Sequence, residues 1–223
     1  MDKTALSLET VRTNAAIHQL IKVADDHLGA QGYTEHGQRH ASLVSHIAEN
    51  VLARLGHAPR VAELAAIAGY LHDIGNVVNR HDHATAGAVM GFDLLLRLGM
   101  DPEEAAIVAG AIGNHEERVG EPVSAASAAV IIADKSDVHR TRVRNPNPAN
   151  FDIHDRVNDA SQHSFVRIDP ERRIVALELT IDVARASVVD YFEIFLTRML
   201  FIRKSARFLD CGFNLFINRT QML

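Results

Sequence analysis

The sequence predicts a mainly α-helical bundle followed by a small α+β subdomain. Before residue 145, apolar residues recur at helical spacing in successive segments that glycine or proline separates. Strict alternation of apolar and polar residues occurs only later, from Val175 to Ile181, where it predicts a strand. We therefore expect a helical domain over residues 1–145 and an α+β subdomain over residues 146–223 that packs on it.

The first two predicted helices come before residue 56. The pattern of residues 8–28 is helical, and Gly29 ends it. Thr34 can cap the next helix, which carries Val44 on its apolar stripe. His40 lies four residues before Val44, so its side chain belongs to the same inward face.

The third predicted helix ends in the most informative stretch of the chain. Pro59 suits its first turn, and residues 61–71 are almost wholly apolar. His72 and Asp73 follow directly. An ionised carboxylate at the end of a core-facing helix costs several kcal/mol unless a cation or hydrogen bonds compensate it. The rest of the sequence therefore has to supply a partner for Asp73.

Three further predicted helices each carry one polar residue that could be a metal ligand. The apolar stripe of residues 83–98 begins at His83, and the stripe of the helix that Asp101 caps continues to His115. A later helix has Asp134 on its apolar face. Polar side chains thus recur on the inward sides of successive helices.

A loop and then strands follow the helical part. Residues 145–148, with two Asn-Pro pairs, are typical of a loop. Residues 165–169 and 174–181 are predicted strands, and residues 213–217 can return as a third, so we expect an antiparallel sheet of two or three strands. Between them, residues 183–209 form a long predicted helix that is apolar nearly all round. Such a helix has to be buried on several sides, and we expect a homodimer to cover part of it.

The composition is that of an ordinary soluble globular protein. Of the 223 residues, 47% are hydrophobic and 23% are charged, and the formal net charge of −5 does not favour nucleic acid as a partner. The single cysteine, Cys211, excludes an internal disulfide and fits a reducing cytoplasm. We expect neither a secretion signal nor a membrane span, because the most apolar late segment is short and contains charged residues. Histidine is unusually frequent, with thirteen residues.

Six of the polar residues on these helices can share one metal cluster. Each alone has an ordinary explanation, such as a buried histidine that donates to a carbonyl or an aspartate that caps a helix. Six such placements in one core would need six separate hydrogen-bonding solutions, whereas one cluster satisfies them together. The candidate ligands are His40, His72, Asp73, His83, His115 and Asp134.

The donor types also indicate the class of metal. Four imidazoles with two carboxylates suit divalent transition ions such as Fe, Mn, Zn, Co or Ni better than Ca, and Mg is a poorer match to so much nitrogen. Two ions about 3.5–4 Å apart, with Asp73 as a bridge, would leave positions for a water and a substrate oxygen. Such a site makes hydroxide near neutral pH and binds phosphate oxygens.

At these residues the sequence resembles the HD-domain metal-dependent phosphohydrolases, over residues 30–145. The resemblance depends on five short patterns in order, which are Arg39-His40, Leu71-His72-Asp73-Ile74-Gly75, His83 with Gly87-Ala88, Asn114-His115-Glu116 and Ala133-Asp134-Lys135. The two histidines between the doublet and the last aspartate resemble the binuclear branch of the family. The resemblance implies that one ion is held by His40, His72, Asp73 and Asp134. It implies a second ion at His83 and His115, with Asp73 as the bridge.

Two groups within that branch refine the expectation. The spacing from His83 to Gly87 is most similar to bacterial HD enzymes that split diadenosine tetraphosphate symmetrically. The HD-GYP enzymes, which cleave cyclic di-GMP, are related, but residues 116–122 contain no Gly-Tyr-Pro. Many family members have a lysine after the glycine that follows the doublet. This chain has Asn76 there, so that contact is either missing or supplied elsewhere.

Basic residues after the last predicted ligand are candidates for contacts with phosphate. Guanidinium and ammonium groups both pair with phosphate oxygens. We expect Asp73 and Lys135 to be catalytic, and we expect substrate contacts from Arg140, Arg144 and His154. The alternative for the basic residues is a solvated helix face, and the alternative for His154 is a role in fixing a loop.

These observations predict a metal-dependent phosphohydrolase that cleaves a phosphoester or phosphoanhydride of a nucleotide or dinucleotide by means of a metal-bound hydroxide. Two other classes remain open. One is a non-catalytic nucleotide-binding sensor or regulatory protein, in which the tail transmits binding to a partner. The other is a di-iron oxygenase, since a few relatives use the same cluster with oxygen. Hydrolysis is favoured because phosphate explains both the open metal site and the neighbouring basic residues.

Overall fold

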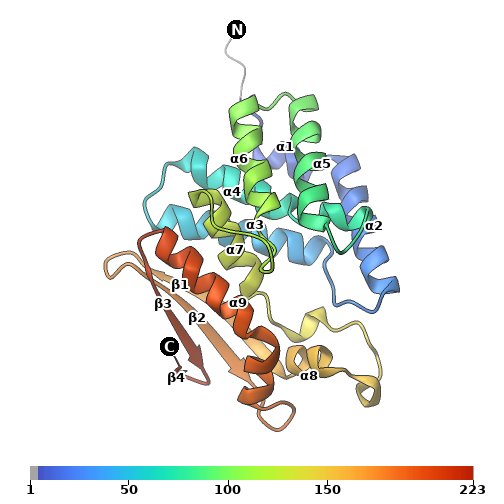
Figure 1. Cartoon of the computed structure of the whole chain (residues 1–223), viewed down its shortest axis with the longest axis vertical. Helices are drawn as coiled ribbons and strands as arrows, with labels where there is room; N and C mark the ends of the chain where they lie inside the picture. The colour runs from blue at the N-terminus through green and yellow to red at the C-terminus, as the bar shows by residue number, and fades with distance from the viewer. Residues whose placement is uncertain (1–4, 223) are drawn as a thin grey trace.

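The computed structural model describes residues 5–222. It confirms the predicted fold class, a helical bundle with a small α+β subdomain (Figure 1). The helices of the first part are α1 (Leu8–Arg12), α2 (Ala15–Ala30), α3 (Gln38–Arg54), α4 (Pro59–Leu71), η1 (Ile74–Val77), α5 (His83–Arg97), α6 (Pro102–Gly113) and α7 (Ala125–Ser136). The later elements are η2 (Arg140–Arg142), η3 (Pro148–Asn150), α8 (Ile153–Ala160), β1 (Ser161–Asp169), β2 (Ile174–Ile181), α9 (Val188–Phe208), β3 (Gly212–Ile217) and β4 (Thr220–Gln221).

The first predicted helix is divided into α1 and α2 at Asn14. The side chain of Asn14 accepts hydrogen bonds from the backbone N–H groups of Ala16 and Ile17. An asparagine in this position caps a new helix, so the continuous pattern is interrupted there. The next helix, α3, begins at Gln38 rather than close to Thr34.

Helices α3, α4 and α7 pack against one another at the centre of the helical part. Gly69 of α4 lies close to α3, where an added Cβ would be 3.1 Å from the backbone of Ser45. Every residue of α7 over 126–136 is buried, because α3, α4 and α6 cover one side and α9 and β1 cover the other. The polar residues of α7 are therefore held in the centre of the molecule.

Within residues 5–222 the sheet has four strands in the order β1-β2-β3-β4. Val166 of β1 lies opposite Leu177 in an antiparallel pair, but Leu177 lies opposite Leu215 of β3 in a parallel pair. The expected antiparallel sheet of two or three strands is thus corrected to a mixed sheet of four. The reason is α9, which connects β2 to β3. A helical crossover returns the chain to the same end of the sheet and makes the two strands parallel.

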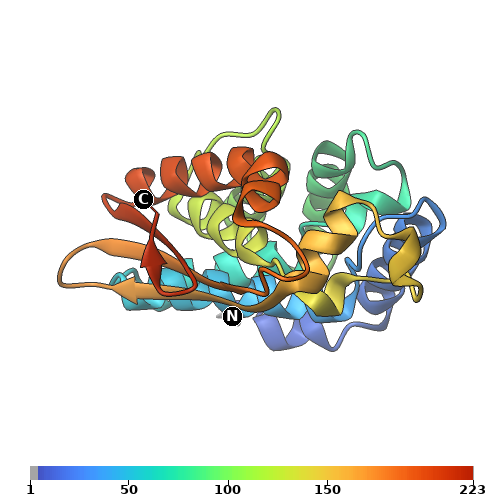
Figure 2. The same ribbon diagram turned by 90° about the horizontal axis from the view of Figure 1, so that it is seen from below.

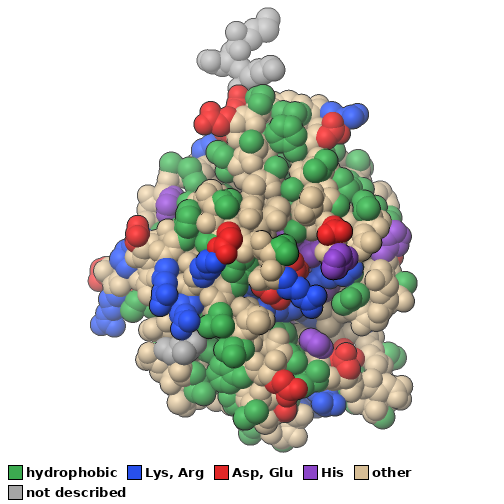
Figure 3. Space-filling model, viewed as in Figure 1, with side chains coloured by type: hydrophobic (Ala, Val, Ile, Leu, Met, Phe, Trp, Pro, Cys, Tyr) green, Lys and Arg blue, Asp and Glu red, His purple; other side chains and the backbone are tan. Residues whose placement is uncertain are grey.

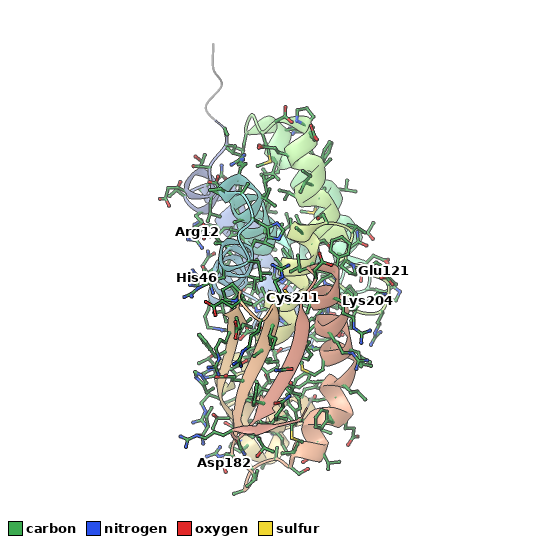
Figure 4. The ribbon with its side chains drawn as sticks, turned by 90° about the vertical axis from the view of Figure 1, so that its left-hand side faces the viewer. Arg12, His46, Glu121, Asp182, Lys204 and Cys211 are labelled. Atoms are coloured by element: carbon green, nitrogen blue, oxygen red, sulfur yellow. The ribbon has the colours of Figure 1, made fainter. Side chains whose placement is uncertain are left out.

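Helix α9 packs on this sheet and also against α7 (Figure 2). Its buried inner side chains include Tyr191, Phe195 and Met199. Near its C-terminal end, Lys204 pairs with Glu121 of the loop before α7 (Figure 4). Much of the apolar surface of α9 is therefore buried within one chain. Leu196 and Leu200 are still 46% and 41% exposed, and the homodimer remains a prediction.

The contact between α7 and α9 joins the two parts of the chain. The division of the chain into a domain of residues 1–145 and a subdomain of residues 146–223 stays a prediction. No helix in the described part of the chain is long and apolar enough to cross a membrane.

Candidate metal centre

The structure brings the six predicted ligands together in the core of the helical part. They come from five helices or helix ends, and each side chain is buried. The residues and their elements are His40 in α3, His72 and Asp73 at the end of α4, His83 at the start of α5, His115 after α6 and Asp134 in the last turn of α7. Segments far apart in the sequence thus converge on one point.

Hydrogen bonds at Nδ1 fix the orientation of the imidazoles. Nδ1 of His72 is 2.8 Å from the carbonyl oxygen of Gly69, and Nδ1 of His83 is 2.9 Å from that of Arg80. His115 has the same contact with a carbonyl oxygen of α6, at 2.6 Å. A carbonyl oxygen can only accept, so in each ring Nδ1 carries a hydrogen, and in the neutral ring Nε2 has the lone pair that can bind a cation.

These lone pairs face each other in two pairs. Nε2 of His40 and Nε2 of His72 are 3.2 Å apart, and those of His83 and His115 are 3.0 Å apart. Nδ1 of His40 donates to Oδ2 of Asp137 at 2.7 Å, so this ring has its lone pair on Nε2 as well. Two acceptors at such a distance repel unless a proton or a cation lies between them. Ligand atoms on one ion are about 3 Å apart, because metal–nitrogen bonds are about 2.0–2.1 Å long, so the spacing suits a shared cation.

Asp73 lies between the two pairs and faces each pair with a different oxygen. Oδ2 is 3.1 Å from Nε2 of His72 and 3.6 Å from Nε2 of His40. Oδ1 is 3.6 Å from Nε2 of His83 and 3.9 Å from Nε2 of His115. Oδ2 is buried and has no hydrogen-bond partner among the described residues, which is costly for a carboxylate. This arrangement fits a carboxylate that bridges two cations.

Asp134 completes the group at the Oδ2 side of Asp73. Its Oδ1 is 3.3 Å from Nε2 of His40 and 3.7 Å from Nε2 of His72. Two overlapping sets of donor atoms are each compact enough for an ion, namely His40, His72 and Asp134, and His72, Asp73 and His115. Nε2 of His72 belongs to both sets and can bind one ion only, and His83 belongs to neither. The donor chemistry therefore fits divalent transition ions. The number and identity of the ions remain predictions.

The electrostatics of the cluster keep its carboxylates ionised. Burial raises the pKa of Asp73, but the surrounding histidines, His72 above all, together outweigh burial and the pKa lies well below its usual value. Burial also raises the pKa of Asp134, but Lys135, His40 and His72 together outweigh it and hold the pKa well below its usual value. Burial holds the pKa of His115 well below its ordinary value, so this ring stays neutral. Burial also lowers the pKa of His72, but Asp73 beside it raises the value above the ordinary one. Ionised carboxylates and neutral imidazoles are the forms that bind metal, so a metal at His72 has to displace the proton that the raised pKa favours.

A family model identifies the part of the chain that holds this cluster. Residues 37–140 match the model of the HD domain. These residues form an HD domain. A solved structure of a predicted HD superfamily hydrolase from an uncultured Thermotogales bacterium is 26% identical, with a TM-score of 0.45, and the match covers 56% of this chain and 67% of that one. No curated protein matches the chain significantly.

Lys135 of the HD domain lies beside the cluster but is already paired. It is 6% exposed, and its Nζ is 2.7 Å from Oδ2 of Asp134 and 2.7 Å from Oε2 of Glu117. Two carboxylates therefore neutralise its charge. This geometry gives Lys135 a role in positioning Asp134, and its direct contact with a substrate remains a prediction.

The three predicted substrate-binding residues lie in other surroundings. Arg144 pairs with Asp25 of α2. Arg140 and His154 are exposed, and among the described residues no contact joins either of them to the cluster. Their roles in substrate binding remain predictions.

Two residues that adjoin the cluster are not among the predicted site residues. The ring of His36 packs edge-on against His40, with ring centroids 5.4 Å apart, and its Nδ1 is 2.7 Å from the carbonyl oxygen of Thr34. His36 precedes the first residue of α3, so the helical period that indicates His40 does not extend to it. Arg80 reaches the cluster from a loop, with Nη1 3.5 Å from Nε2 of His83. No periodic pattern indicates this contact.

Proposed function

We propose that this protein is a metal-dependent phosphohydrolase that cleaves a phosphoester or phosphoanhydride of a nucleotide or dinucleotide. The observation that carries the proposal is the position of Asp73, a buried carboxylate that faces one pair of histidines with each oxygen. The HD domain supports a metal-dependent hydrolase in general. The phosphate and nucleotide parts of the proposal go beyond that.

Divalent cations bound by these residues would supply Lewis acidity, which activates water and neutralises charge on a phosphate oxygen. The protein itself holds the donor atoms in position. Asn76 donates its side-chain N–H to Oδ1 of Asp73 at 2.9 Å and so fixes the shared carboxylate. Asp137 accepts from His40 and is itself bound by Nη2 of Arg39 at 2.8 Å. Partners of this kind orient the ligand side chains.

Cationic side chains around the cluster support a substrate that carries phosphate. Figure 3 shows Lys and Arg side chains, together with acidic and His side chains, around a hollow near the middle of the face that is turned to the viewer in Figure 1. Guanidinium groups and metal ions both stabilise the negative charge that develops when a phosphoryl group is transferred. The nucleotide part of the proposal depends on the motif-level resemblance to HD enzymes that act on nucleotides.

The proposal is tested with protein loaded with Mn²⁺, Fe²⁺ or Zn²⁺ and offered dinucleoside polyphosphates, cyclic dinucleotides and mononucleotides. Product formation is measured for the wild type, for Asp73→Ala and for His46→Ala. His46 is exposed on α3, the helix that also carries His40, so we expect His46→Ala to retain turnover and Asp73→Ala to lose it. Absence of hydrolysis by fully loaded wild type would contradict the proposal. Nucleotide binding without turnover would support the sensor instead.

A further inference from the structure

Arg80 is a cationic side chain that reaches the cluster with open hydrogen-bond donors. It lies in the turn between η1 and α5. Its Nη1 is 3.3 Å from Oδ1 of Asn76, 3.5 Å from Nε2 of His83 and 3.9 Å from Oδ1 of Asp73. Nε and Nη2 of Arg80 have no hydrogen-bond partner within residues 5–222. Part of its donor capacity is therefore free.

The guanidinium group of Arg80 is held in place from two sides. The backbone carbonyl oxygen of Arg80 accepts from Nδ1 of His83 at 2.9 Å, which ties the turn to a predicted ligand. The guanidinium carbon lies 5.5 Å from the centroid of the Tyr33 ring, at a distance typical of a cation–π contact. The side chain is 25% exposed, so solvent and small molecules reach it.

The other cationic side chains near the cluster are paired with carboxylates. Lys135 has two carboxylate partners at 2.7 Å. Arg39 pairs with Glu35 at 2.7 Å and with Asp137 at 2.8 Å, and Arg142 lies 3.7 Å from the same Asp137. In contrast, the nearest carboxylate oxygen to Arg80 is 3.9 Å away, and it belongs to the shared ligand of the cluster. Arg80 is thus available to an external anion.

We propose that Arg80, braced by Tyr33, binds a phosphate oxygen of the substrate at the end of the cluster formed by His83. This inference rests on the proposed function, because it assigns a contact to its phosphate-bearing substrate. A guanidinium group offers parallel N–H donors that match two phosphate oxygens. Arg80 is therefore a binding residue for the group under attack and sets a preference for phosphate.

The contact is tested by equilibrium dialysis of Mn²⁺-loaded protein with radiolabelled inorganic phosphate. Charged hydrogen bonds of this kind change a dissociation constant by about tenfold to a hundredfold, and we expect Arg80→Ala to weaken phosphate binding by this factor. Arg80→Lys keeps the positive charge but loses the planar guanidinium group with its parallel N–H donors. We therefore expect its affinity for phosphate to lie between those of the wild type and Arg80→Ala. Arg97→Ala is the matched control, because Arg97 is on α5, is 76% exposed and pairs only with Asp93 among the described residues. Its affinity for phosphate should equal that of the wild type.

Substitution of Tyr33 independently tests the cation–π contact that holds Arg80. The ring makes the contact, so we expect Tyr33→Phe to bind phosphate like the wild type and Tyr33→Ala to bind more weakly. Metal content of every variant is measured by elemental analysis and should be unchanged. Phosphate affinity of Arg80→Ala within about twofold of the wild type, at equal metal content, would overturn the inference. If the loaded wild type itself binds no phosphate, the contact from Arg80 is overturned, whereas the proposed function is judged separately by product formation from the nucleotide substrates.

Discussion

Gly75 has no side chain because the backbone of α5 occupies the space beside it. A Cβ on Gly75 would lie 2.0 Å from the carbonyl oxygen of His83 and 2.4 Å from the backbone nitrogen of Gly87. Any larger residue would have to displace the start of α5. Because α5 begins with His83, this close approach is also what brings that imidazole to Asp73.

We expect Gly75→Ala to destabilise the protein by about 1–3 kcal/mol, the usual cost of forcing an extra carbon into a packed site, or by more. Chemical denaturation measures the change, and metal content shows whether His83 is displaced. Gly110→Ala is the control, because Gly110 lies inside α6 and its added Cβ would approach nothing closer than 3.9 Å. If Gly75→Ala were as stable as Gly110→Ala, the close approach would not be a requirement of the fold.

The predicted ligands and the missed residues differ in a physical way. His40 and Asp134 lie on apolar helical stripes, so the period of the helix indicates that they point inward. His36 and Arg80 precede α3 and α5 in loops, where no period relates sequence position to direction. Their contacts depend on the path of the loop, which tertiary packing decides.

At the scale of elements, an ion-pair group connects α4 to α6. Nε of Arg60 donates to Oε1 of Glu104 at 2.7 Å, and its Nη1 is 2.7 Å from Oε2 of Glu63. The hydrogen bond from Arg60 lowers the pKa of Glu104 below its ordinary value of 4.5. A lowered folded-state pKa means that the pair stabilises the protein above pH 4.5. That contribution is lost as the pH falls through the folded-state pKa.

We expect Glu104→Gln to destabilise the protein by about 0.5–1 kcal/mol at pH 7, as for a partly exposed ion pair. The difference from the wild type should shrink progressively below pH 4.5, because Glu104 then becomes neutral in both folded and unfolded states. Urea denaturation at a series of pH values measures both the loss of stability at pH 7 and its decrease below pH 4.5. Asp26→Asn, which breaks the exposed Lys22–Asp26 pair within α2, is the control and should have little effect. A pH-independent difference would show that charge is not the cause.

A second ion-pair group connects α7, the loop after α6 and α9. Lys135 pairs with Asp134 and Glu117, and Nε of Arg198 on α9 is 3.6 Å from Oε1 of Glu117. Burial raises the pKa of Glu117, but Lys135, with a smaller effect of Arg198, outweighs burial and the pKa falls to about 2. The buried ammonium of Lys135 is therefore the central charge among these ion pairs.

We expect Lys135→Met to destabilise the protein by about 3–5 kcal/mol, because two buried carboxylates lose their common partner. The measurement is chemical denaturation in the presence of chelator, so that bound metal does not contribute. Arg198→Ala removes a more exposed charge from the same group and should cost about 1 kcal/mol or less. Equal effects of the two substitutions would mean that Lys135 is not the centre of the group.

The strands show where prediction from sequence stops. The alternation of apolar and polar residues predicts a strand over residues 174–181, and β2 has the same bounds. The predicted third strand, residues 213–217, begins one residue later than β3. The parallel pairing of β2 with β3 has no such signal, because strand direction depends on how α9 crosses the sheet. The short helix α8 was also not predicted, because its composition resembles that of the loop before it.

At the scale of the whole molecule, the C-terminal part packs against the helix that carries Asp134. Helix α9 and strand β1 cover the side of α7 that the other helices leave open, and α7 carries Asp134. A series of ion pairs also connects the two parts. It runs from Arg198 through Glu117 and Lys135 to Asp134. Metal that binds the folded chain only will stabilise both parts together.

The most direct test of the shared cluster is elemental analysis of protein purified without chelator, beside His83→Ala and His46→Ala. We expect about two divalent transition ions per chain in the wild type and in His46→Ala, and about one in His83→Ala, because only one end of the cluster loses a ligand. Wild-type protein that retains no transition metal, or His83→Ala with the same content as the wild type, would contradict the shared cluster.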